Sequence, residues 1–192
     1  IANPTKFMQV WGKIFRKSII YENRIGFNTK MQLSEDSDFT LHYLMHCSRI
    51  SISDTIFYHY SIDNESTMRS NADKKVLQYI EAMNITSKYI EKQHENVQLS
   101  FNDYILMHLN IACVRGIFCV NNKENYVKKI EHIKKIINTP VFKDAIKKFH
   151  IKNNFSARTL PVFFMKYKLV HIASIIYIVR AYQNYIYEKS RN

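Results

Sequence analysis

Glycine and proline are scarce in this sequence of 192 residues, with three of each. Both residues are typical of tight turns, so their scarcity favours helices over a fold of many short strands. The three cysteines show no Cys-x-x-Cys spacing, which argues against a disulfide framework or zinc site and for reduced thiols in the cytosol. The longest apolar run, residues 169–179, is much shorter than the roughly 20 residues of a membrane span. It fits either a core helix or a helix lying in the membrane interface.

Positive charge is concentrated at the C-terminal end of the chain. Residues 1–120 carry 13 basic and 12 acidic side chains, whereas residues 121–192 carry 15 basic and 4 acidic ones. The second segment therefore has a net charge of +11, which predicts an anionic partner, either membrane lipid or nucleic acid. The chain begins with Ile1 rather than Met, and we expect it to be part of a longer protein.

Apolar residues recur at the helical period through most of the chain. The pattern predicts helices over residues 35–47, 76–90, 105–120, 127–137 and 162–188. Ser34 stands where an N-cap belongs, before three acids in the first turn of the first helix. Residues 49–62 instead alternate β-branched or aromatic with polar residues, which predicts two short strands.

The acids of "SEDSDF", residues 34–39, have two interpretations. Acids are common in a first helical turn, because the free N–H groups there stabilise negative charge. The same stabilisation keeps a carboxylate deprotonated, so Glu35 or Asp36 could serve as a general base in a cleft. The residues alone leave both interpretations open.

The surrounding motifs bear on this choice. They follow one another as "VWGKIFRKSII" (10–20), "IGF" (25–27), "SEDSDF" (34–39) and "CSRISISDTIFYHYSIDNESTMR" (47–69). In this order they resemble the second half of bacterial family 2 glycosyltransferases with the GT-A fold. The resemblance implies an α/β fold, with residues 1–70 as the acceptor-side part of a Rossmann-like GT-A domain. Residues 71–192 would form a basic, mostly α-helical extension.

The resemblance also implies an activity. Such enzymes move a sugar from a nucleotide-sugar donor to an acceptor hydroxyl with inversion at the anomeric carbon. Asp36 matches the catalytic base of the family's acidic motif, and Glu35 its neighbour that helps to place a substrate. Asp38 fits less well, because the motif falls on the two preceding residues. The string "DSD" at 36–38 matches Asp-x-Asp, yet it follows no apolar strand. We therefore expect the metal- and donor-binding half to be absent, and this chain alone to be inactive.

Five further residues are candidates, each with a structural alternative. Trp11 is either an acceptor-sugar platform or a packing residue. Lys13 and Arg16 either neutralise a diphosphate or an anionic acceptor, or form a solvated basic edge. Arg69 either meets the donor diphosphate or is an ordinary loop arginine. His59 is a weak candidate metal ligand, or a structural histidine.

The complete enzyme is expected to need a divalent metal, Mg or Mn, and to use a saccharide or lipid-linked acceptor. It would work in bacterial capsule or surface polysaccharide synthesis, in the cytoplasm at the inner face of the plasma membrane. Residues 121–192 would contact anionic lipid, and the helical extension could form a homo-oligomer. The alternative is a non-enzymatic basic helical module that binds nucleic acid or acts as an oligomerisation or membrane-surface subunit.

Overall fold

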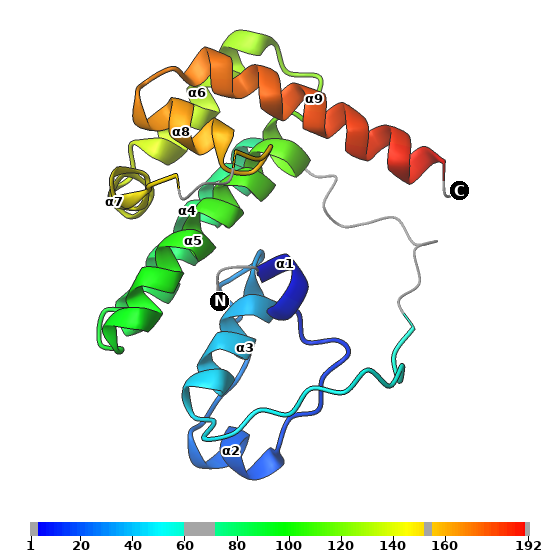
Figure 1. Ribbon diagram of the computed structural model, residues 1–192, viewed down its shortest axis with the longest axis vertical. Helices are drawn as coiled ribbons and strands as arrows, with labels where there is room; N and C mark the ends of the chain where they lie inside the picture. Colours follow the sequence, from blue (N-terminus) through cyan, green and yellow to red (C-terminus); the bar gives the residue numbers. More distant parts are fainter. Residues whose placement is uncertain (1–3, 60–71, 152–154, 191–192) are drawn as a thin grey trace.

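The computed structural model describes residues 4–59, 72–151 and 155–190, and every regular element in these ranges is a helix (Figure 1). The helices are α1 (Pro4–Phe7), α2 (Lys17–Glu22), α3 (Glu35–Met45), α4 (Ala72–Ile90), α5 (Glu95–Ile111), its continuation as a π-helical turn η2 (Ala112–Ile117), α6 (Tyr126–Ile137), α7 (Pro140–Lys148), α8 (Leu160–Lys166) and α9 (Val170–Lys189).

The expected α/β, Rossmann-like GT-A fold is wrong for this part of the chain. Residues 49–59 alternate as a strand does, yet they are irregular, and Ile50, Ile52 and Ile56 are 66%, 90% and 78% exposed. Alternating apolar and polar residues indicate a preference for a pleated, half-buried surface. Such a segment becomes a strand only where a neighbouring strand pairs with it. A two-stranded hairpin without further strands is only marginally stable. No partner strand forms in the described residues, so the predicted strand pair does not form there.

The helical part is organised around α4 and α5, which lie side by side as the green helices of Figure 1. The turn η2 packs on α4, α5, α6 and α9, and α7 packs on α5. The largest fully buried side chains at these contacts include Tyr104, Leu109, Ile133, Phe142 and Tyr177. This apolar core comes mainly from residues 76–181.

The N-terminal helices join the same core through a few side chains. Met8, Met31 and Leu41 are buried within the apolar cluster that α4 and α5 form. A second, smaller cluster of Ile25, Phe39 and Tyr43 holds α2 and α3 together. The division into residues 1–70 and 71–192 stays a prediction.

The helix predicted over residues 162–188 is two helices. The chain turns between α8 and α9 at Lys168, whose φ of 63° is left-handed, and α8 then packs along α9. Helices commonly end at a left-handed residue, which is usually glycine. Lysine at this point gives no such signal, so the sequence did not reveal the turn. No helix among the described residues is both long enough and apolar enough to cross a membrane.

Candidate functional site

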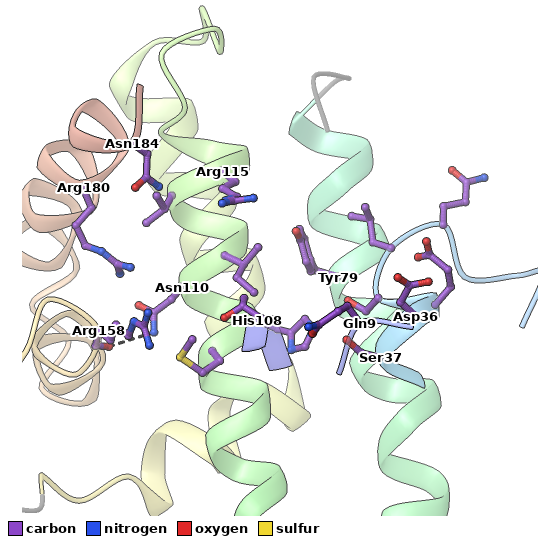
Figure 2. A pocket seen from close by; sticks show the side chains of 18 of the residues that line it. Gln9, Asp36, Ser37, Tyr79, His108, Asn110, Arg115, Arg158, Arg180 and Asn184 are labelled. Atoms are coloured by element: carbon purple, nitrogen blue, oxygen red, sulfur yellow. Dashed lines mark hydrogen bonds between the residues drawn. The ribbon is translucent and has the colours of Figure 1, made fainter. Parts of the chain in front are cut away.

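A cleft of about 620 Å³ lies where the start of α3 meets α4, α5, η2 and α9 (Figure 2). This volume is within the usual range for small-molecule sites. Residues of α3 form one end of the cleft, and residues of α9 and the loop before α8 form the other, on either side of α5 in the figure, with Arg115 of η2 on the continuation of α5 itself. The cleft thus lies between segments that are far apart in the sequence.

The orientation of α3 is fixed by Asp38. Its side chain is 1% exposed, and its Oδ1 accepts hydrogen bonds from the Thr86 hydroxyl at 3.0 Å and the Tyr89 hydroxyl at 2.5 Å, both on α4. Burial and the Asp38 charge raise the pKa of Tyr89, which keeps this phenol a hydrogen-bond donor. Asp38 is therefore a structural carboxylate that attaches α3 to α4.

The same attachment places Glu35 and Asp36 at the cleft. Residues two apart on a helix differ by about 200° in direction, so burying Asp38 against α4 turns Asp36 to another side. Both Glu35 and Asp36 line the cleft and are half-buried. Ser34 occupies the N-cap position, but its φ is 65° and its side chain makes no capping bond. Its backbone carbonyl instead accepts the Asp38 N–H at 2.9 Å.

Trp11 and Lys13 lie close to this carboxylate end. Trp11 lines the cleft, is 40% exposed, and stacks on Tyr58 with ring centroids 5.8 Å apart. Its indole is thus part of a partly open wall. Lys13 Nζ donates to the Gln9 carbonyl at 2.5 Å. Burial lowers the pKa of Lys13, and the Asp36 charge opposes that effect, so an ammonium lies within electrostatic range of the Asp36 carboxylate.

Of the other predicted residues, neither Arg16 nor His59 lines the cleft. The Arg16 side chain is exposed and absent from the cleft, and its backbone N–H donates to the Tyr43 hydroxyl at 2.7 Å. Arg69 lies outside the described residues. His59 is exposed. Within the described ranges, no three His, Cys, Asp or Glu side chains gather closely enough to hold a metal ion, so these residues supply no complete set of protein ligands for the expected divalent metal.

Two buried rings form the middle of the cleft. Tyr79 is 3% exposed and lies between the two ends. Burial raises the pKa of its phenol, the Arg115 charge opposes that rise, and the Glu35 charge adds to it. His108 is also buried, and its Nδ1 lies 2.9 Å from the Tyr104 carbonyl. Burial lowers the pKa of His108 to about 4, so the ring is neutral at pH 7 with Nδ1–H as the donor. Its Nε2 is then a hydrogen-bond acceptor.

Two side-chain amides on the cleft wall carry unused acceptors. Gln9 donates from Nε2 to the Lys6 carbonyl at 2.9 Å, and Asn110 donates from Nδ2 to the carbonyls of Leu106 and Arg158 at 3.0 and 3.1 Å. These bonds fix which atom of each amide is the oxygen. Gln9 Oε1 and Asn110 Oδ1 are buried and accept no hydrogen bond from the described residues. Hydroxyl-rich ligands would supply the missing donors.

The sequence did not predict the opposite end of the cleft. Arg115, Arg158 and Arg180 line it, and Figure 2 shows Arg158 and Arg180 close together beside Asn110 and Asn184. These arginines come from η2, the loop before α8, and α9. The excess charge of residues 121–192 was a signal for two of them, but nothing in their spacing shows that they converge.

Comparison with known proteins gives one distant relative that bears on function. The chain is 22% identical over 186 residues to "Putative glycosyltransferase EpsH" of Bacillus subtilis (strain 168). The match covers 95% of this chain and 53% of that protein, so the chain spans about half the length of the relative. No protein-family model matches the chain, and no solved structure matches it. The similarity supports a relationship to glycosyltransferases in general.

Proposed function

We propose that the protein is a glycosyltransferase of the inverting type, with Asp36 as the general base. The main support for this proposal is the position of Asp36, which lies at the start of α3 on the wall of a cleft that Glu35 and Trp11 also line. The distant similarity to a protein named as a glycosyltransferase supports the same class. Membership of family 2 is part of this proposal.

The chemistry needs a carboxylate beside the acceptor. In an in-line displacement the acceptor hydroxyl loses its proton while its oxygen attacks the anomeric carbon from the face opposite the departing nucleoside diphosphate. Asp36 would take this proton. Glu35 would hold a neighbouring sugar hydroxyl, and the Trp11 ring would pack against the C–H face of a sugar. Gln9 Oε1 would accept from a further hydroxyl.

Donor and metal chemistry belong to the complete enzyme in this proposal. A nucleotide-sugar is the donor and a saccharide or lipid-linked saccharide the acceptor, in capsule or surface polysaccharide synthesis. The divalent metal remains a proposal for the complete enzyme. No step assigned to Asp36 or Glu35 depends on it.

The test is a transfer assay on the full-length protein. It is incubated with a panel of nucleotide-sugars and saccharide acceptors, and the released nucleoside diphosphate and the glycoside product are measured. We expect product with one donor class, and an inverted anomeric configuration of that product by NMR. If the protein releases nucleoside diphosphate from none of the donors, the activity is refuted. If the product retains the anomeric configuration of the donor, the inverting mechanism is refuted. A steep salt dependence of DNA binding without transfer would instead favour the non-enzymatic alternative.

A location at the membrane surface is supported by α9. One side of this helix is buried through Val170, Ala173, Ser174, Tyr177 and Ala181. Much of the remaining surface is apolar and at least 38% exposed: Ile172, Ile175, Ile178, Val179, Tyr182, Tyr185, Ile186 and Tyr187. Aliphatic and tyrosine side chains next to a strongly basic segment are typical of interfacial helices, and the net charge of +11 selects an anionic lipid surface.

Vesicle co-sedimentation tests this location. The full chain should pellet with vesicles containing phosphatidylglycerol and remain in solution with pure phosphatidylcholine, and added salt should release it. Ile175→Asp on α9 should reduce binding, while Ile52→Asp, an equally drastic change at an exposed residue elsewhere, should not. Equal binding to both vesicle types would contradict the electrostatic part of the proposal.

A further inference from the structure

The arginine end of the cleft, formed by Arg115, Arg158 and Arg180, has properties of a site for an anion. None of the three has a carboxylate within ion-pairing distance among the residues that the structure describes. Surface arginines in a protein are commonly solvated one by one, but here three from separate elements line a single cleft. Three guanidinium groups that form no ion pair with a described carboxylate raise the local potential at their end of the cleft and favour an anionic ligand there.

The positions of two of these arginines are held by the fold. Arg180 donates from Nη1 to the Ala157 carbonyl at 3.0 Å, and Asn110 Nδ2 donates to the Arg158 carbonyl at 3.1 Å. Burial lowers the pKa of Arg180, and the neighbouring Arg158 charge lowers it further. The two like charges therefore repel each other at close quarters, and a bound anion would relieve this repulsion.

We propose that the arginine end binds the phosphate or diphosphate group of the acceptor, while the carboxylate end, Glu35 and Asp36, receives the acceptor hydroxyl. Guanidinium groups match phosphate oxygens with paired N–H donors, which makes arginine the favoured partner for such groups. The buried and unpartnered Asn110 Oδ1 lies at the same end and needs a hydroxyl donor. A sugar phosphate ester supplies both the anion and the hydroxyl.

The charge arrangement decides which way the ligand lies. Glu35 and Asp36 repel a phosphate at their end of the cleft, whereas the three arginines attract it at theirs, and Tyr79 and His108 are neutral rings between them. A ligand with one anionic and one hydroxylated end is thus held in a single orientation. The binding of the anion is independent of the proposed function, whereas its assignment to the acceptor rests on it.

Calorimetric titration of the full-length protein with inorganic pyrophosphate tests the site. Arg115→Gln and Arg158→Gln are suitable variants, because both side chains are exposed and their loss should not disturb the fold. Each should weaken binding by about tenfold, the size expected for hydrogen bonds to a charged group. Arg49→Gln, which removes the same charge from an exposed residue outside the cleft, should leave the affinity unchanged. Absence of pyrophosphate binding, or equal affinity in all four proteins, would overturn the site.

A second titration separates acceptor from donor. Pyrophosphate is titrated again in the presence of a saturating amount of whichever nucleoside diphosphate binds most tightly among UDP, GDP, ADP and dTDP. Unchanged pyrophosphate affinity supports the acceptor assignment, and competition would overturn it, because the arginines would then hold the donor. Both titrations measure binding alone, so a failed transfer assay leaves their outcome interpretable.

Discussion

The buried carboxylate of Asp38 accepts a hydrogen bond from the Thr86 hydroxyl at 3.0 Å, and this bond connects the first turn of α3 to α4. The neighbouring Tyr89 hydroxyl donates to the same oxygen. Because Asp38 is held in this way, the acids that precede it in the same turn lie at the cleft. One acid of "SEDSDF" thus has a structural role, and the structure leaves the other two available for chemistry.

Replacing Asp38 by alanine should destabilise the fold. The change leaves the hydroxyls of Thr86 and Tyr89 without their acceptor in a buried environment, which costs about 2–4 kcal/mol. Urea unfolding followed by circular dichroism measures it. The control is Asp144→Ala, which removes an exposed carboxylate paired with Lys148 at 2.6 Å and should cost less than about 1 kcal/mol. Similar losses in both variants would mean that Asp38 is not the attachment of α3.

Fluorescence of Trp11 should report on saccharide binding. Trp11 is the only tryptophan of the sequence and lines the cleft with 40% of its surface exposed. A sugar packed on the indole changes its environment and should shift or quench the emission. Trp11→Ala should weaken saccharide binding several-fold, and Trp11→Phe, which keeps an aromatic face, should weaken it less. Binding detected by calorimetry without any change in emission would place the sugar elsewhere.

His108 should make stability depend on pH. Burial lowers its pKa from 6.5 to about 4 in the folded protein. Between about pH 4 and pH 6.5 the unfolded chain therefore binds a proton that the folded chain does not, and stability falls as the pH falls. A difference of this size corresponds to about 3 kcal/mol.

Unfolding of His108→Leu at a series of pH values tests this dependence. The variant should lose the His108 contribution to the slope across the same window, whereas His150→Leu, at an exposed residue, should keep the profile of the unchanged protein. An identical slope with and without His108 would show that this imidazole does not titrate as its burial implies.

Helices with a clear apolar period were predictable from the sequence, and those near 35–47, 76–90 and 127–137 are confirmed as α3, α4 and α6. The strand pair predicted over residues 49–62 is wrong for residues 49–59, because alternation indicates only a preference for a pleated surface and no partner strand forms among the described residues. Helix α7 has no counterpart among the predicted helices, although it begins at Pro140 and proline is typical of the first position of a helix.

The candidate site likewise has residues that the sequence revealed and residues that it did not. Glu35, Asp36 and Trp11 lie in short motifs, and a motif can be recognised without a structure. Arg115, Arg158 and Arg180 are separated by 43 and 22 positions in the sequence, and only the packing of η2 and α9 brings them to one cleft. Periodicity and local composition carry no information about such a convergence.

The central claim is that the Asp36 carboxylate takes a proton from the acceptor hydroxyl. The most direct measurement is the turnover of the Asp36→Asn full-length protein, with the donor and acceptor pair that the transfer assay identifies, beside Glu35→Gln. We predict that Asp36→Asn lowers kcat by about 10²–10⁴ while nucleotide-sugar affinity and the unfolding midpoint stay the same, and that Glu35→Gln has the smaller effect. A kcat for Asp36→Asn within about twofold of the unchanged protein would contradict it.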